Sequence, residues 1–297
     1  MSAAAPLASL LDGWQPEPTA QGERITAQPA GALAGLLDQP SPATADGDPL
    51  PPLWHWVYLL ERPPQRDLGP DGHPADGPFL PPIPHRRRMF AGGRVEYRAP
   101  LRIGDEITRR TALAGWTVKQ GRAGELLFVT IRHTFTRAGD LLATEEQDLV
   151  YRSDPTGTQT PAPAPAQAPA PARQAPPPAP AGDWRLDACP DPVLLFRFSA
   201  LTYNAHRIHY DAPYATTVEG HPGLVVHGPL LALLCLELPR RHAPGRAVTQ
   251  LSFRARRPVY AGQRFTAAGS AAGHACELAI TTADGTQAMT ATATFTP

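Results

Sequence analysis

The densest group of side chains that could do chemistry lies between residues 197 and 215, in the run RFSALTYNAHRIHYDAPYA. The run contains His206 and His209, together with Asn204 and Arg207. An unperturbed imidazole titrates at about pH 6.5, so a histidine can take a proton and return it near neutrality. A carboxamide cannot exchange a proton but can hold a water molecule, and an arginine can grip a carboxylate. The run therefore predicts an acid–base site.

A second patch, GLVVHGP at residues 223–229, leads into an apolar segment from Gly228 to Leu238. Pro229 stands at an early position and Pro239 follows the segment, which is the pattern of a fully buried helix. The first amides of a helix lack partners and lie at the positive end of its dipole. Because glycine lets a ligand approach the backbone closely, we expect the Gly228 amide to stabilise a developing negative charge.

These two patches lie in the second of two parts of the chain. Residues 154–183 are almost wholly Pro, Ala, Gln, Thr and Gly, a composition that cannot bury a core and is typical of a disordered linker. The linker separates residues 1–153 from residues 184–297. A partner-docking role of the Pro-rich tract is the alternative to a plain spacer.

The two parts share one pattern of elements. Alternating strands are expected near residues 95–105 and 126–135 in the first part, and near 251–263 and 276–282 in the second. Short turns at residues 137–140 and 283–286 precede a last strand in each part. An apolar segment comes before the strands, Leu53–Leu60 in the first part and the helix from Gly228 in the second. The repeat indicates a duplicated α+β unit but does not by itself name the fold. A buried helix followed by an antiparallel sheet is the pattern of a hotdog, so we expect a double hotdog in which two antiparallel sheets each wrap a central helix.

The chemistry-bearing motif resembles that of the MaoC-like, or hydratase 2, family of enoyl-thioester hydratases and dehydratases. In that family an aromatic residue and Ser precede an acidic residue, then Asn, Pro and His, and a His-Gly pair at a helix start follows. The resemblance places the catalytic histidine at His209 and the helix-start glycine at Gly228. The motif departs from the family at Asn204, His206 and Arg207, which replace the acidic residue, the Asn and the Pro.

The departures resemble one branch of the family. This branch contains type 2 hydroxyacyl-thioester dehydratases and the hydratases of mesaconyl-C4-CoA (3-methylfumaryl-CoA) and itaconyl-CoA. Its N-terminal signature is similar to LPPIPHRRRMFAGGR at residues 80–94. The resemblance implies a degenerate first hotdog over residues 1–153, which shapes the substrate and coenzyme A pocket, and a catalytic second hotdog over 184–297.

The function expected from this resemblance is reversible hydration of the α,β double bond of an acyl-CoA. The favoured substrates are mesaconyl-C4-CoA and itaconyl-CoA. No metal or redox cofactor is expected, since coenzyme A is part of the substrate. His209 would move the protons, and Asn204 would orient the water. The alternatives are a 3-hydroxyacyl-ACP or -CoA dehydratase of fatty chains, a hotdog thioesterase and a non-catalytic acyl-thioester binding protein. Glu219 is the nearest candidate carboxylate for a thioesterase.

Several residues are expected to bind substrate. Arg207 could pair with the free carboxylate of a dicarboxylic acyl group, or else point to solvent or to coenzyme A phosphates. The basic set Arg86, Arg87, Arg88 and Arg94 could meet the nucleotide phosphates or form a solvated patch. His206 and His227 could each bind substrate, or could instead stabilise the loop in which they lie.

The composition indicates which partners and which cellular compartment to expect. Lys plus Arg and Asp plus Glu number 27 each, so no overall field attracts nucleic acid or an anionic membrane. The three cysteines show no CxxC spacing, which favours a reducing compartment over disulfides. The sequence shows neither a secretory signal nor a span of about 18 apolar residues. We expect a cytoplasmic enzyme with acyl-CoA or acyl-ACP as its partner, and a homodimer remains compatible with the fold.

Overall fold

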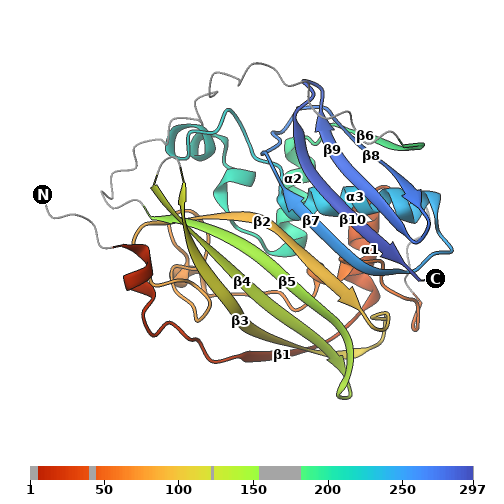
Figure 1. Ribbon diagram of the computed structural model, residues 1–297, viewed down its shortest axis with the longest axis horizontal. Coiled ribbons are helices and arrows are strands. Elements are labelled where there is room, and N and C mark those ends of the chain that lie inside the picture. Colours follow the sequence, from red (N-terminus) through yellow and green to blue (C-terminus); the bar gives the residue numbers. More distant parts are fainter. Residues whose placement is uncertain (1–5, 40–44, 122–123, 154–181, 297) are drawn as a thin grey trace, which may run out of the picture.

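The computed structural model describes residues 6–39, 45–121, 124–153 and 182–296 (Figure 1). The α-helices are α1 (Ala27–Leu36), α2 (Pro192–Thr202) and α3 (Gly228–His242). Single turns of other helix types are η1 (Leu7–Leu11), η2 (Trp54–Val57), η3 (Gln65–Asp67), η4 (Arg207–His209) and η5 (Tyr214–Val218). The first five strands are β1 (Thr19–Arg24), β2 (Arg86–Tyr97), β3 (Glu106–Gly121), β4 (Gly124–Arg137) and β5 (Asp140–Ser153). The other five are β6 (Trp184–Ala188), β7 (Val248–Ala255), β8 (Phe265–Ala272), β9 (Ala275–Thr282) and β10 (Gln287–Phe295).

The strands form one continuous ten-stranded sheet in the order β1-β3-β4-β5-β2-β7-β10-β9-β8-β6. The first five places belong to the first part of the chain and the last five to the second, as the duplication predicts. The two predicted sheets are therefore the halves of one sheet, joined where β2 pairs antiparallel with β7. The Pro/Ala-rich segment predicted at 154–183 lies, except for Gly182 and Asp183, outside the described residues.

Two adjacent glycines allow the halves to join. Gly92 pairs with Arg254 and Gly93 with Phe253 across the seam. A Cβ atom at Gly92 would lie 2.3 Å from the carbonyl oxygen of Phe253, and one at Gly93 would lie 2.6 Å from that of Glu146. No side chain fits at such distances, because carbon and oxygen atoms in contact stay more than 3 Å apart. The Gly-Gly pair thus lets β2 approach strands on both sides.

The hairpin predicted at residues 137–140 is present between β4 and β5. Its two central residues, Ala138 and Gly139, both have positive φ (50° and 91°). This is the backbone that the twist of a two-residue hairpin requires, and glycine adopts it without strain. The prediction of this turn from the Gly-Asp pair is confirmed.

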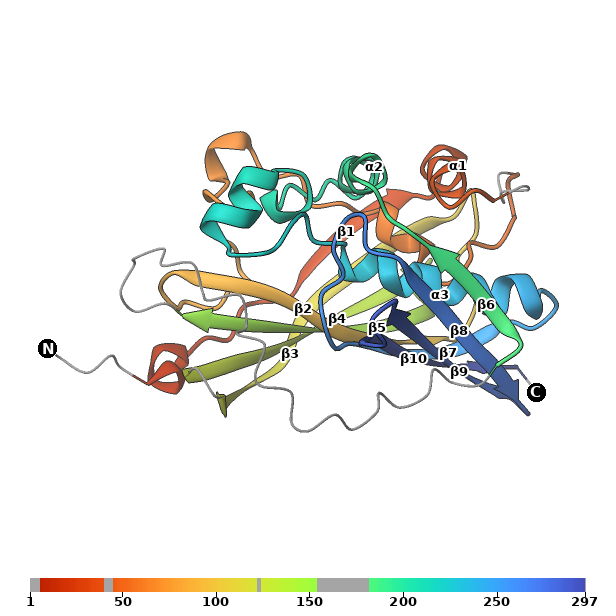
Figure 2. The same ribbon diagram turned by 90° about the horizontal axis from the view of Figure 1, so that it is seen from above.

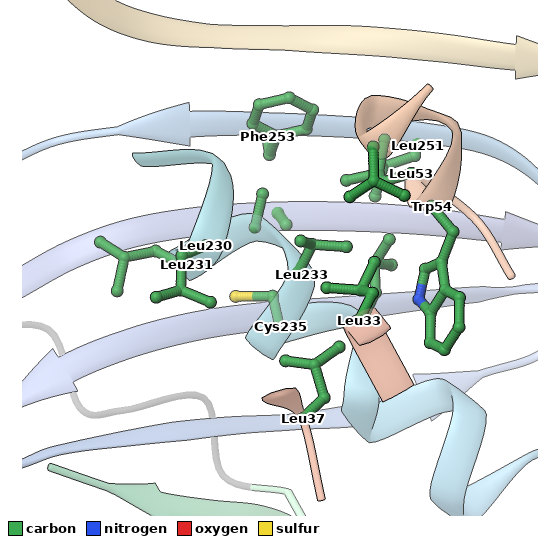
Figure 3. Packing of buried hydrophobic residues seen from close by; sticks show 14 of the residues in the cluster. Leu33, Leu37, Leu53, Trp54, Leu230, Leu231, Leu233, Cys235, Leu251 and Phe253 are labelled. Carbon is green, nitrogen blue, oxygen red and sulfur yellow. The ribbon is translucent and has the colours of Figure 1, made fainter. Parts of the chain in front are cut away.

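Helix α3 is the central element of the second half. Leu230, Leu233 and Cys235 are at most 2% exposed and pack toward the sheet and toward Leu33 and Trp54 (Figure 3). The predicted helix ended at Leu238, whereas the observed helix continues through Pro239 to His242. A proline inside a helix removes one hydrogen bond. Pro239 itself is buried, and the ion pairs of Glu237 with Arg240 and Arg241 accompany the extension.

The first half departs from the predicted arrangement at its centre. Leu53–Leu60 was expected to be the counterpart of α3, but its only regular element is the short turn η2. Leu53 and Leu59 adopt positive φ (68° and 53°), which ends a helix on either side. The segment is buried nonetheless, and its Trp54 joins the core around α3. The three α-helices lie on one side of the sheet (Figure 2).

In the described part of the chain no helix is long and apolar enough to cross a membrane. All three cysteines are free: Cys189 is exposed, and Cys235 and Cys276 are buried.

Candidate active site

His209 lies in the short turn η4 and is 7% exposed. Its Nδ1 lies 2.7 Å from the carbonyl oxygen of Val225. Because a carbonyl only accepts, Nδ1 carries the proton and Nε2 is left with a free lone pair. Burial lowers the pKa of His209 to about 4. The imidazole is therefore neutral at pH 7 and is held in the tautomer that a base requires.

The start of α3 lies directly against this imidazole. The ring of His227, the residue before Gly228, stacks on the ring of His209 with centroids 3.6 Å apart. His227 is fully buried, and its Nε2 lies 2.9 Å from Ser199 Oγ. The structure thus brings His209 and Gly228 together, as the motif predicts, and gives His227 a hydrogen bond that orients the helix start.

Asn204 has a local partner. Its Oδ1 accepts a hydrogen bond from the backbone N–H of His206 at 3.0 Å, which fixes the loop between α2 and η4. The expected role of this oxygen in holding water is therefore shared with a structural one. The ring of His206 lies edge-on to that of His209, with centroids 5.5 Å apart. His206 is 8% exposed and forms part of the wall beside the base.

A loop of the first half, which the sequence did not single out, reaches the same place. His73 lies with its ring centroid 4.1 Å from that of His206. Its Nδ1 is 3.0 Å from Asp71 Oδ2, and burial lowers the pKa of His73. The His-Pro pair in the segment PDGHPADG marks a loop with an imidazole, and this was the available signal.

Asp71, His73 and His206 bring possible metal-ligand atoms within 4.8 Å of one another. The sequence indicated no third ligand near His206, because Asp71 and His73 come from the distant first half. The Asp71 carboxylate is already bonded to the backbone N–H and the ring of His73. Arg88 adds a positive charge that lowers the pKa of both imidazoles, after the larger effect of burial. The positive charge of Arg88 and the hydrogen bonds of Asp71 to His73 do not favour a bound cation at these three residues.

Arg207 has a different place from the one expected. Its Nε and NH2 group donate to Asp211 Oδ2 at 3.0 and 2.7 Å, and its NH1 group donates to the carbonyl oxygen of Pro70 at 3.0 Å. The guanidinium also lies over the ring of Tyr214, 4.1 Å from its centroid. These contacts tie the loop of Arg207 to the loop of Asp71, and they do not favour Arg207 as a ligand of a substrate carboxylate. Asp211 also accepts a hydrogen bond from the Tyr214 backbone N–H at 3.0 Å.

Three of the four expected arginines lie together. Arg86, Arg87 and Arg88 line a cavity of about 380 Å³ with Asp71 and His73. Arg94 does not join them, which corrects the predicted set. It lies six residues further along β2, where it forms ion pairs with Glu146 and Asp148 and borders a separate hollow.

Glu219 also lines the cavity, but it is committed to other residues. Its carboxylate lies 3.7 Å from Arg87 NH1 and accepts a hydrogen bond from the Tyr214 hydroxyl at 3.3 Å. A carboxylate held in this way is a poor nucleophile for thioester cleavage, so the geometry does not favour the thioesterase alternative.

Comparison with known proteins identifies the family. The family model for hydroxyacyl-thioester dehydratase type 2 matches residues 53–261. The chain belongs to this family. It is also 46% identical over 263 residues to the mesaconyl-C(4)-CoA hydratase of Chloroflexus aurantiacus, which covers 88% of this chain and 89% of the relative. A member of this family is a hydro-lyase of acyl thioesters, so the expected enzyme class is confirmed.

Solved structures confirm the fold of this dehydratase-family chain. A MaoC-like dehydratase from Phytophthora capsici superposes with a TM-score of 0.64 at 14% identity, covering 98% of each chain. A Mycobacterium tuberculosis protein described as a double hotdog gives a TM-score of 0.59 at 14% identity, covering 97% of this chain and 98% of the other. The α+β double-hotdog prediction is therefore confirmed.

Proposed function

We propose that the enzyme adds water across the double bond of mesaconyl-C4-CoA, or of a close dicarboxylic analogue such as itaconyl-CoA, to give a citramalyl-type thioester. The observation that carries the proposal is the buried, neutral His209, whose ring stacks on that of His227, the residue directly before α3. The 46% identity to a mesaconyl-C(4)-CoA hydratase supports the choice of substrate.

The reaction needs one base, one acid and one site for negative charge. His209 Nε2 takes a proton from water as the water oxygen bonds to Cβ, and the π electrons move through Cα to the thioester oxygen. The Gly228 amide at the helix start donates a hydrogen bond to this enolate oxygen. The enolate then collapses and Cα takes the proton from the imidazolium, so one water is added in all. A pKa of about 4 makes the protonated His209 a ready donor in that last step.

We also propose a division of labour between the two parts of the chain. Residues 184–297 hold His209, Gly228 and the positioning residue Asn204. Residues 1–153 shape the pocket through the loop of His73 and the start of β2. Contacts across the halves support this division, because Arg207 donates to Pro70 and His206 packs on His73.

The test is the loss of ultraviolet absorbance of the conjugated enoyl thioester. Wild-type enzyme should consume mesaconyl-C4-CoA, and His209→Ala should lower kcat by about 10²- to 10⁴-fold, the usual contribution of an acid–base. His274→Ala removes an exposed imidazole between β8 and β9 and should leave the rate unchanged. An unaffected His209→Ala enzyme would refute the assignment of the base.

A second candidate is dehydration of 3-hydroxyacyl chains on coenzyme A or an acyl carrier protein. The family description favours it, since it names the dehydratase direction. The same assay run in reverse, with 3-hydroxybutyryl-CoA and a long 3-hydroxyacyl-ACP, separates the two. Faster turnover of the long acyl carrier than of any dicarboxylic thioester would establish the second candidate.

A further inference from the structure

Unlike Arg86 and Arg87, Arg88 has no hydrogen-bond or ion-pair partner among the residues that the structure describes. Arg86 donates to the carbonyl oxygens of Pro81 and Ala75, and Arg87 forms an ion pair with Glu219. Arg88 forms no hydrogen bond or ion pair with any residue that the structure describes, although it is partly buried and lines the same cavity. A guanidinium that has lost part of its hydration without gaining a carboxylate is expected to bind an anionic ligand.

A second unpartnered group lies beside it. Arg88 pairs with Tyr151 across β2 and β5. The Tyr151 side chain is 1% exposed and lines the cavity, and its hydroxyl has no hydrogen-bond partner in the described part of the chain. Burial raises the pKa of Tyr151, and the charges of Arg88 and Arg86 act to lower it. An O–H donor left unpaired in a buried position costs free energy until a ligand accepts from it.

Resting on the function proposed above, we propose that Arg88 and Tyr151 form the subsite that binds the free carboxylate of the acyl group. The guanidinium supplies the charge and its paired donors, and the phenol supplies a further donor to the same carboxylate. The subsite makes the enzyme selective for dicarboxylic acyl groups over simple alkenoyl groups.

The position of the pair favours the acyl carboxylate over a coenzyme A phosphate. In mesaconyl-C4-CoA the carboxylate is attached to Cβ, the carbon that receives the hydroxyl group, so its ligand must lie near the base. Alternation along β2 puts Arg88 on the same face as Phe90, whose ring lies against Gly228. The Arg88 charge also acts on His206, whose ring borders that of His209. Nucleotide phosphates stay at the solvent-exposed mouth of a pocket, where a hydroxyl as buried as that of Tyr151 could not reach them.

Two substitutions test the subsite. Arg88→Gln should lower kcat/KM for mesaconyl-C4-CoA by about 10- to 100-fold, the range for a hydrogen-bonded charge, and change that for crotonyl-CoA less than threefold. Tyr151→Phe should lower the mesaconyl-C4-CoA value by about 5- to 10-fold. Because the hydroxyl has no partner among the described residues, Tyr151→Phe should not lower Tm, whereas loss of a hydroxyl that stabilises the fold would. Arg66→Gln, which removes a guanidinium with 84% exposure, serves as the matched control.

Binding measurements on the His209→Ala enzyme separate the two sources of anion without turnover. Calorimetry should show that Arg88→Gln weakens binding of mesaconyl-C4-CoA and leaves binding of crotonyl-CoA and of free coenzyme A unchanged. Equal weakening of all three would place a coenzyme A phosphate on Arg88 and overturn the proposal, as would no weakening of any. Failure of wild-type enzyme to hydrate any enoyl-CoA would refute the proposed function alone, because the binding comparison still tests the subsite.

Discussion

Replacement of Gly228 by alanine tests whether the start of α3 stabilises the enolate. A Cβ atom at this position would lie 2.7 Å from Cδ1 of Phe90. Since carbon atoms in contact stay about 3.5 Å apart, the ring or the helix start must move by about 0.8 Å. The ring of Phe90 cannot easily yield, because it stacks on Phe253 with centroids 5.9 Å apart. We therefore expect the helix start, and with it the amide of residue 228, to shift.

The expected cost is about 10²-fold in kcat. Loss of one oxyanion donor costs about 10²- to 10³-fold, and a misplacement of about 1 Å can cost 10²-fold. The assay is initial hydration rate with mesaconyl-C4-CoA at saturation, with Tm recorded for each variant. Gly223→Ala is the matched control, because a Cβ atom there meets nothing within 4 Å, and it should keep the wild-type rate.

A double substitution identifies the cause. If the clash with Phe90 displaces the amide, then Phe90→Ala should restore part of the rate in the Gly228→Ala enzyme, as a positive coupling in a double-mutant cycle. A Gly228→Ala enzyme that keeps more than a third of the wild-type rate would refute the assigned role of this amide. Strictly additive effects would show that the contact with Phe90 is not what positions it.

Two further predictions follow from buried ionisable groups. Because His209 is a base only when neutral and burial lowers its pKa to about 4, the acid limb of kcat/KM should lie near pH 4 rather than near 6.5. A limb near 6.5, measured with a stopped assay across pH 3.5–8, would contradict this environment. Glu145, although buried, has its pKa lowered to about 2 by the charge and hydrogen bond of His55, so its stabilisation is complete above its usual pKa of 4.5 and is lost as pH falls toward 2. Glu145→Gln should lower the free energy of unfolding by up to about 3 kcal/mol at pH 7 and flatten its pH dependence below 4.5, as urea denaturation at a series of pH values would show.

Local signals in the sequence were enough to predict much of the fold. The Gly-Asp turn after Arg137 and the apolar helix from Gly228 depend on short-range preferences, and both are present. The absence of a long helix at Leu53–Leu60 was not predictable in the same way. An apolar run has the same sequence pattern whether it forms a buried helix or a buried turn. The positive φ angles at Leu53 and Leu59 arise from packing against the rest of the core.

In the site, too, the contacts between residues close in sequence could be predicted, and those between distant segments could not. The motif around His209 and the start of α3 lie close in sequence, and the structure brings them together. Arg207 contacts Pro70, and His206 packs on His73. Each contact joins residues more than 130 positions apart in the sequence, so no motif spacing could indicate it. A charge in a motif does not tell whether another part of the protein already neutralises it. For this reason the sequence offered Arg207, which has Asp211 beside it, as one possible carboxylate ligand. It did not distinguish Arg88, which has no partner among the described residues, from Arg86 and Arg87.

The pairing of β2 with β7 also determines which edges of the sheet remain open to pairing with another protein molecule. Because the seam closes the two inner edges of the halves, the sheet offers backbone groups to solvent only along β1 and β6, within the described residues. These strands are six and five residues long, and β6 carries the exposed ion pair of Arg185 and Asp187. Short, charged edges resist the strand-to-strand addition that leads to aggregation. The duplication has thus turned an interface that two separate hotdogs would have to form at a given concentration into one that a single chain always carries.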